Sequence, residues 1–226
     1  MSLNSTDDIP IIILPGTGAD RRCYLPQIEA FHRVIIAERL DPEQNESLDD
    51  YARRVAEKYN PGCPCYLAGH SFGGIIAPKV ARYLDVRAVF LIASIRGAEE
   101  LPPRHRIFSP LILHWRFGAK LLLRGIDLLT RFMLTIFPWA MSAAQRSVAR
   151  QGLSMSIDWF YWVTYQLLAW DEPVPANYPY PVFQIHGARD MILSYRRTMP
   201  DVVIPRAGHL ITLSHPDEVN AFIREK

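Results

Sequence analysis

The chain has 226 residues, of which 49% are hydrophobic and 21% are charged, and its formal net charge is +2. This length and apolar content allow one globular domain with an insertion. The nearly balanced charge gives no overall electrostatic case for nucleic acid, and we expect no nucleic-acid partner.

The first residues and the cysteines bear on where the protein works. Residues 1–8 lack the basic start and the apolar run of a signal peptide, so the sequence predicts a cytoplasmic protein. Cys23, Cys63 and Cys65 cannot all pair and lack the spacing of a zinc site, which favours reduced thiols. The longest apolar stretch, residues 111–141, is interrupted by five charged residues and is not expected to span a bilayer as a bare helix.

Short β-branched runs alternate with helical stretches along the chain, which is typical of parallel βαβ units. The runs are continuously apolar, as expected where helices cover both faces of a sheet. We predict six strands, at Ile9–Leu14, Val34–Ala37, Cys65–Ala68, Ala88–Ile92, Val182–His186 and Val202–Ile204. Helices are predicted from the capping candidate Ser47 to Lys58, from Phe72 to Leu84, and after a capping box at Ser214–Asp217.

The pattern changes from about Arg96 to Tyr178, where strand-like runs are lost and apolar residues recur at helical spacing. We interpret residues 96–178 as an inserted helical cap, with residues 1–95 and 179–226 forming the core domain. Prolines at both edges of this insertion, among them Pro102 and Pro173, stop helices and stiffen the connections.

The segment Gly69-His70-Ser71-Phe72-Gly73 is a G-x-S-x-G pentapeptide. In this motif a serine occupies a sharp turn between a strand and a helix, and its flanking glycines are needed because strand and helix cross closely. A strand candidate precedes the motif here and a helix candidate follows it. The amino end of that helix directs partial positive charge at the reacting oxygen. We therefore predict that Ser71 is a nucleophile; the alternative is a loop serine in a glycine turn.

Together these segments resemble the α/β-hydrolase family over most of the chain outside the insertion. Residues 11–18 are similar to the family's first core strand and oxyanion loop, residues 186–190 to the strand end that carries its acid, and residues 207–209 to the loop that carries its histidine. The order Ser, Asp, His is that of the family. The resemblance implies an α/β fold with a mostly parallel, doubly wound sheet and a helical cap.

Three features depart from the family pattern. Only eight residues precede Ile9, so the family's first two strands have no room and six strands are expected rather than eight. Pro15 stands where many members have histidine, and Pro78 falls inside the helix after Ser71, where it should kink the helix. None of these departures removes a catalytic group.

The predicted chemistry needs three side chains, because a serine hydroxyl is a poor nucleophile until an imidazole takes its proton and a carboxylate orients that imidazole. We assign Ser71, His209 and Asp190 to these roles. The alternatives are a turn-forming role for Asp190 and a base other than His209 among the remaining histidines.

A tetrahedral oxyanion needs preorganised N–H donors. We predict that the backbone amides of Thr17 and Phe72 supply them. The alternative for the first loop is a plain tight turn between a strand and a helix. Four glycines are expected to give the loop and the elbow room: Gly16, Gly18, Gly69 and Gly73.

All five tryptophans lie in the predicted cap, which needs a core of its own but also turns apolar surface toward the cleft. From Leu101 to Ile157 the sequence has eight basic residues against one acid. Solvated arginines, with Arg124 and Arg131 paired to Asp127, explain this charge, and attraction of an anion or an anionic membrane surface explains it as well. The candidate substrate-binding residues of the cap are Trp115, Phe132, Trp159, Trp162, Arg124 and Arg131.

The leading hypothesis is hydrolysis of a carboxylic ester or thioester through an acyl-serine intermediate, with no metal and no organic cofactor. The expected substrate is a small molecule with an apolar part, and an anionic or carrier-bound acyl ester fits the basic cap. Dehalogenase and epoxide hydrolase chemistry need a carboxylate in place of Ser71. Carbon–carbon bond hydrolysis and peracid formation stay open, as do a non-catalytic binding role and peripheral membrane contact through the cap. The sequence does not fix the oligomeric state.

Overall fold

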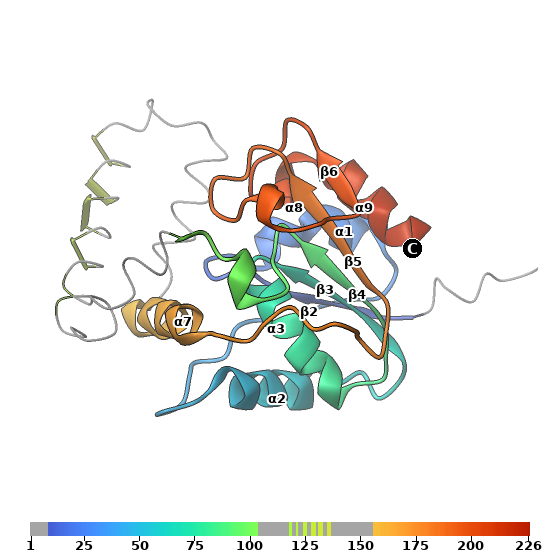
Figure 1. Ribbon diagram of the computed structural model, residues 1–226, viewed down its shortest axis with the longest axis horizontal. Coiled ribbons are helices and arrows are strands. Elements are labelled where there is room, and N and C mark those ends of the chain that lie inside the picture. Colours follow the sequence, from blue (N-terminus) through green and yellow to red (C-terminus); the bar gives the residue numbers. More distant parts are fainter. Residues whose placement is uncertain are drawn as a thin grey trace, which may run out of the picture. The chain divides into compact units, whose positions relative to one another are not determined.

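In the computed structural model, six parallel strands form one sheet in the order β2-β1-β3-β4-β5-β6 (Figure 1). The structure describes residues 9–103, residues 156–226 and single helical positions between 118 and 136. The strands are β1 (Ile11–Leu14), β2 (Val34–Ile36), β3 (Cys65–His70), β4 (Val86–Ile92), β5 (Val182–Gly187) and β6 (Val202–Ile204). The α/β fold with a parallel six-stranded sheet is therefore confirmed, and each strand lies where the sequence predicts one.

Helices lie in most of the connections between the strands, and two more follow the last strand. In the order of the chain, the helices with described bounds are α1 (Leu25–Ala30), α2 (Leu48–Tyr59), α3 (Phe72–Val80), α7 (Ile157–Ala169), α8 (Ile211–Ser214) and α9 (Pro216–Glu225). Short 3₁₀ helices lie at Arg21–Tyr24, Ala81–Tyr83, Ala98–Glu100 and Tyr195–Arg197. No helix in the described ranges combines the length and the apolar character that crossing a membrane requires.

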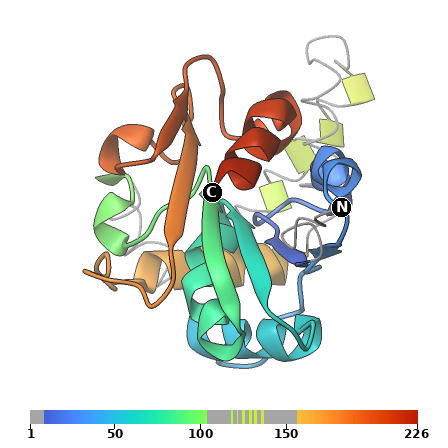
Figure 2. The same ribbon diagram turned by 90° about the vertical axis from the view of Figure 1, so that its right-hand side faces the viewer.

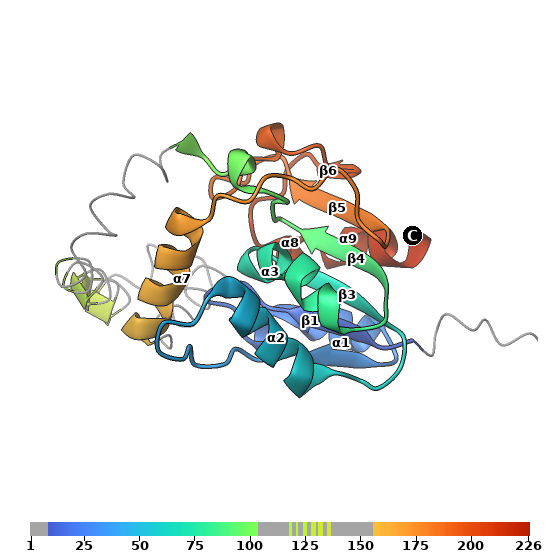
Figure 3. The same ribbon diagram turned by 60° about the horizontal axis from the view of Figure 1, so that its bottom comes forward.

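The sheet is covered on both faces. Helices α1 and α9 pack together on one side and α2 and α3 on the other, as Figure 2 and Figure 3 show from two directions. This explains why the strands are apolar along their whole length: all four residues of β1 are buried, as are the last five of β4. The amphipathic helix α2 starts at Ser47, whose hydroxyl accepts a hydrogen bond from the amide of Asp50, as predicted.

The order of the strands reverses direction between β1 and β3. The chain moves from β1 outward to β2 and then crosses back to β3 on the other side of β1. Loops leaving the carboxyl ends of β1 and β3 therefore run to opposite faces of the sheet, and such a switch point is the usual position of a ligand in open α/β sheets. Gly16 follows β1 at this point, and Ser71 follows β3.

Contacts divide the chain into two compact units. One comprises Met1–Gly16, Asp20–Pro102 and Asp171–Lys226, and the other comprises Thr17–Ala19 and Pro103–Trp170. Residues 96–102 and 171–178, which the sequence analysis places in the insertion, belong to the first unit. There the amide of Ala98 donates to the carbonyl of Glu172, so the two stretches are joined to each other.

The structure differs from two of the local predictions. Helix α3 runs through Pro78 but ends at Val80 and passes into a 3₁₀ turn, short of the predicted end at Leu84. The prediction of a capping box at Ser214–Asp217 is wrong, because Ser214 ends α8 and His215 is the N-cap residue of α9. The hydroxyl of Ser214 bonds to the ring of His215 instead. Pro216 does lie in the first turn of α9, as predicted.

Candidate active site

Ser71 lies alone between the end of β3 and the start of α3, with φ 54° and ψ −121°. A positive φ is strained for a residue with a side chain, and such strain is characteristic of a serine held at the tip of a strand-to-helix turn. The carbonyl oxygen of Ser71 accepts hydrogen bonds from the amide of Gly74 at 2.9 Å and from the hydroxyl of Ser94 at 2.7 Å. These contacts hold the turn through the backbone carbonyl of Ser71 and leave its side chain at the tip of the turn.

Two glycines make this turn possible. A Cβ atom on Gly73 would overlap the carbonyl oxygen of Leu14 at the end of β1, and one on Gly69 would overlap the backbone of Gly74. Both clashes involve backbone atoms, which cannot rotate away. The motif glycines are therefore required where β3, α3 and β1 approach most closely.

The structure brings the three candidate catalytic side chains together. Nε2 of His209 lies 2.8 Å from Oγ of Ser71, and Nδ1 of His209 lies 2.7 Å from Oδ2 of Asp190. The three residues come from separate loops, after β3, after β5 and after β6. This arrangement can move a proton from the hydroxyl to the imidazole while the carboxylate stabilises the resulting charge.

Asp190 is held as an ionised acceptor. Its side chain is fully buried, Oδ1 accepts from the amides of Ile192 and Leu193, and Oδ2 accepts from His209. Burial by itself raises the pKa of this carboxyl, but hydrogen bonds from His186 and His209 outweigh it and hold the pKa well below its usual value. Asp190 thus fixes His209 in the tautomer whose Nε2 lone pair faces Ser71.

The two candidate oxyanion donors lie in different parts of the structure. Phe72 is the first residue of α3, where backbone amides point out of the helix end. Thr17 follows Gly16 in the chain and belongs to the second unit, in which its carbonyl accepts a hydrogen bond from Nε1 of Trp159 at 2.9 Å. Gly18 lies in the same short loop. The donor roles of Thr17 and Phe72 stay predictions.

Among the candidate substrate-binding residues, Trp159 is only 2% exposed and stacks on Trp162, with 5.6 Å between the ring centroids. Phe132 is 53% exposed, and Arg124 and Arg131 are also exposed. Trp115 and Asp127 lie outside the described residues, so the predicted pairing of Asp127 with the arginines does too. Trp159 therefore packs within its own unit, and the substrate-binding role of these residues stays a prediction.

Several residues support the site in ways that the sequence did not predict, although it did place His70 as a packing neighbour of the elbow. Ser94 holds the elbow, and its own carbonyl accepts from the buried amide of Gln184. Tyr24 and His70 form a buried hydrogen bond at 3.2 Å beside Ser71. His186 was assigned to a strand end, but its Nε2 also lies 3.4 Å from Oδ2 of Asp190. The only available signal was the position of His70 next to the predicted nucleophile.

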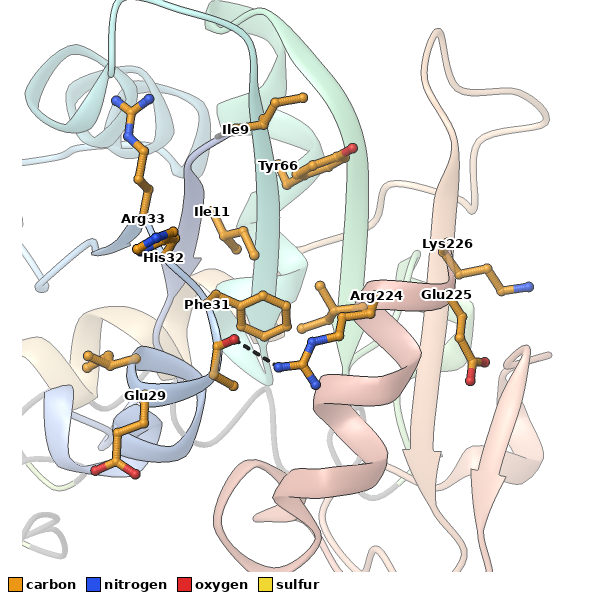
Figure 4. Close-up of a pocket in the computed structure, with 13 residues that line it drawn as sticks. Ile9, Ile11, Glu29, Phe31, His32, Arg33, Tyr66, Arg224, Glu225 and Lys226 are labelled. Carbon is orange, nitrogen blue, oxygen red and sulfur yellow. Dashed lines mark hydrogen bonds between the residues drawn. The ribbon is translucent and has the colours of Figure 1, made fainter. Parts of the chain in front are cut away.

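A cavity of about 800 Å³ lies at the opposite end of the sheet. Figure 4 shows its lining, which includes Ile11 from the start of β1, Tyr66 from the start of β3, and Arg224 of α9 hydrogen-bonded to the carbonyl of Ala30. It adjoins the amino ends of the strands, whereas Ser71, Asp190 and His209 follow carboxyl ends. This cavity is therefore not the candidate active site.

A family model described as "Alpha/beta hydrolase family" matches residues 11–222. The chain belongs to the alpha/beta hydrolase family. No curated protein matches it significantly in a sequence comparison.

Solved structures share the fold at low sequence identity. A thermophilic esterase from Thermogutta terrifontis superposes with a TM-score of 0.67 and 18% identity, covering 96% of this chain and 88% of that one. An enol-lactonase from Burkholderia xenovorans gives 0.69 and 16%, covering 96% and 91%. A structure from a study of epoxide hydrolases in metagenomes from hot environments gives 0.62 and 21%, covering 97% and 91%. These likenesses establish the fold, and the chemistry must be argued from the residues of this chain.

Proposed function

We propose that this protein is a serine hydrolase that cleaves a carboxylic ester or thioester through an acyl-serine intermediate. The observation that carries the proposal is the position of His209, whose ring nitrogens lie 2.8 Å from Oγ of Ser71 and 2.7 Å from Oδ2 of Asp190. A serine at this position also argues against epoxide hydrolase chemistry, which uses a carboxylate as the nucleophile.

In the first half-reaction, Nε2 of His209 accepts the proton of Ser71 as Oγ attacks the carbonyl carbon of the substrate. Asp190, kept ionised by its hydrogen bonds, stabilises the imidazolium that forms. The negative charge that develops on the substrate oxygen is stabilised by the amides of Phe72 and Thr17, and one such donor is typically worth about 3 to 4 kcal/mol. The imidazolium then protonates the leaving alcohol or thiol as its bond to the acyl carbon breaks.

In the second half-reaction, His209 takes a proton from water, and the oxygen of that water attacks the acyl carbon. The bond to Oγ of Ser71 breaks, and the serine recovers its proton from His209. The products are the carboxylic acid and the free enzyme. No metal or organic cofactor takes part in these steps.

The proposed substrate has an apolar part, and an anionic group on it would suit the basic residues of the second unit. Support comes from the described positions of the second unit, where Leu128, Leu129 and Phe132 are 69%, 60% and 53% exposed and the nearby sequence positions Arg124 and Arg131 are exposed as well. Apolar contact and a guanidinium group together suit an acyl chain that carries a negative charge.

A fluorophosphonate probe tests the nucleophile directly. We expect wild-type protein to be labelled at Ser71, as located by peptide mass spectrometry, and Ser71→Ala to take up no probe. Ser214 is a matched internal control, because its Oγ lies 2.8 Å from Nδ1 of His215 but is exposed and is not part of the proposed site. Labelling of Ser214 instead of Ser71, or no labelling of folded protein, would contradict the proposal.

A substrate panel then separates the reactions that use the same three residues. Matched 4-nitrophenyl esters and thioesters of increasing chain length, with neutral or carboxylate ends, should show the highest kcat/KM for an apolar acyl group. Turnover of a vinylogous 1,5-diketone with no turnover of any ester would instead favour carbon–carbon bond hydrolysis. Peracid formation would be detected by halide oxidation in the presence of acetate and hydrogen peroxide.

Peripheral membrane contact is a second candidate function, favoured by the same exposed apolar and basic side chains. Apolar side chains at positions 121, 128, 129, 132 and 136 are between 44% and 69% exposed. Vesicles of phosphatidylcholine with and without phosphatidylserine provide the test. Binding that needs the anionic lipid, persists in Ser71→Ala and falls in Leu128→Ser/Phe132→Ser supports this function, and absence of binding by wild-type protein excludes it.

A further inference from the structure

Beneath Ser71, two buried aromatic side chains join the loop after β1 to the loop that carries His209. The amide of Gly16 lies 3.2 Å from the hydroxyl of Tyr24, and that hydroxyl lies 3.2 Å from Nδ1 of His70. Nε2 of His70 lies 3.0 Å from the carbonyl oxygen of His209. Tyr24 and His70 are 0% and 1% exposed. Three segments far apart in the sequence are thus linked through one chain of hydrogen bonds.

The direction of each hydrogen bond follows from the groups at the two ends. The carbonyl of His209 can only accept, so Nε2 of His70 carries a proton. In a neutral imidazole Nδ1 is then an acceptor, which receives the O–H of Tyr24. The oxygen of Tyr24 accepts from the N–H of Gly16. One arrangement of protons therefore gives every group in this series of hydrogen bonds its partner.

The surroundings of His70 keep it neutral. Burial is the largest cause and, with the nearby His209, it lowers the pKa of His70 to about 3. The other charged or titratable groups that act on it are Asp190 and His186, which lie after and on β5. The phenol of Tyr24 is also neutral, because burial raises its pKa. Both residues therefore keep their donor and acceptor roles across the range in which a serine hydrolase works.

We infer that Tyr24 and His70 are positioning residues, which hold the loop of Gly16 and the loop of His209 in register with Ser71. The inference rests on the proposed function, since it concerns how the proposed donors and base are placed. In this role neither Tyr24 nor His70 contacts the reacting atoms. They act through Gly16, which precedes Thr17, and through the backbone of His209.

The geometry favours this role over simple core packing. A Cβ atom on Gly16 would lie 3.2 Å from both Nδ1 of His70 and Cβ of Ser71, so this loop packs directly against His70 and the elbow. The rings of His70 and His209 are 5.3 Å apart between centroids. An apolar residue at position 70 would fill the space but would leave the His209 carbonyl without its donor and the O–H of Tyr24 without its acceptor.

Substitution of His70 by asparagine or by glutamine separates the effects of its two hydrogen bonds. In His70→Asn the side-chain oxygen approximates Nδ1 and can accept from Tyr24, but the donor to His209 is lost. In His70→Gln the amide nitrogen approximates Nε2 and can donate to His209, but the acceptor for Tyr24 is lost. Tyr24→Phe removes the middle link. The matched control is Gln27→Met, because Gln27 is also fully buried and bonds Asn220 and the Thr212 carbonyl away from the reacting groups.

Kinetics with 4-nitrophenyl acetate and the rate of fluorophosphonate labelling provide the readout. We expect His70→Asn and Tyr24→Phe to lower kcat and the labelling rate by roughly 10- to 100-fold with little change in KM, which is the effect of misplaced reacting groups. His70→Gln should retain more activity than His70→Asn, because His209 stays anchored. Gln27→Met should lose thermal stability and keep its kcat. Unchanged kcat in folded His70→Asn and Tyr24→Phe, or equal loss in Gln27→Met, would overturn the inference.

A substrate-free measurement covers variants that fail to fold. In ¹⁵N NMR spectra of histidine-labelled wild-type protein, His70 should show a protonated Nε2 and a bare Nδ1, unchanged between pH 5 and pH 8. A proton on Nδ1, or a titration within that range, would refute the hydrogen-bond chain. The proposed function fails separately, by the absence of probe labelling at Ser71 in wild-type protein.

Discussion

Oδ2 of Asp190 lies 2.7 Å from Nδ1 of His209, and the Asp190 side chain has no exposed surface. The carboxylate therefore fixes the proton of His209 on Nδ1 and leaves Nε2 free to act as a base toward Ser71. Replacement by the isosteric amide would keep the size of the side chain but allow its NH₂ group to face His209, which reverses the tautomer.

We predict that Asp190→Asn lowers kcat by up to roughly 10⁴-fold while the fold is retained. Steady-state kinetics with 4-nitrophenyl acetate measures the effect, and circular dichroism verifies the fold. Asp201→Asn is a suitable control, because Asp201 is an exposed carboxylate just before β6 that accepts a hydrogen bond from the backbone amide of Gln184. Near-normal turnover of Asp190→Asn would remove this residue from the mechanism.

His70 makes stability depend on pH in a defined window. Its pKa is about 3 in the folded protein against an ordinary value of 6.5, so the unfolded chain binds the proton first as the pH falls. The contribution of His70 to stability is thus complete above about pH 6.5 and is lost progressively as the pH falls toward 3. Urea unfolding of wild type and His70→Gln at pH 7, 5 and 4 should show a steeper decline for wild type. Parallel declines would indicate that His70 is already charged when folded.

Lys79 gives a test of a buried charge away from the reacting groups. Its side chain is 3% exposed, and its ammonium lies 3.0 Å from Asp49 of α2 and 2.5 Å from Glu172. Replacing both carboxylates by amides leaves a buried cation without a counter-charge, so Asp49→Asn/Glu172→Gln should lose about 1 to 3 kcal/mol of unfolding free energy or more. Lys79→Met should cost less, since the methionine is apolar and similar in length. The opposite order in thermal denaturation would show that the ion pairs contribute little.

Two glycine-to-alanine substitutions should differ strongly in their effect on stability. Gly73→Ala places a methyl group on the carbonyl oxygen of Leu14, and we expect loss of folding or of more than about 4 kcal/mol, the range typical of severe backbone conflicts. Gly125→Ala meets nothing within 4 Å at an exposed helical position, so it should be neutral or stabilise by up to about 1 kcal/mol. Differential scanning calorimetry of both variants measures this. A folded, fully active Gly73→Ala protein would mean that the elbow can rearrange.

The strands and the order of the reacting residues could be predicted because each depends on local pattern. Continuous apolar runs such as residues 11–14 and 88–92 carry their own signal, and the spacing of glycines around Ser71 specifies a turn. The support around the site could not be found this way. Tyr24 and His70 are 46 residues apart in sequence, and a single hydrogen bond over that separation leaves no periodic trace.

Helix ends show the same limit. A hydroxyl followed three residues later by a carboxylate occurs at both Ser47 and Ser214, and only Ser47 forms the cap. At Ser214 the preceding short helix α8 extends to the serine itself, so the next helix starts from His215. The sequence pattern was identical in kind, and the neighbouring helix decided the outcome.

The backbone at residue 71 also decides which inactive protein is best for trapping a bound substrate. At φ 54° and ψ −121° alanine keeps the strain of the native turn, and such conformations cost of order 1 to 3 kcal/mol. Glycine has no such penalty, so Ser71→Gly would be the more heat-resistant of the two inactive proteins, although it gains backbone freedom when unfolded. A crystallographer seeking the intact ester in place would therefore choose glycine for yield and alanine for fidelity to the native loop.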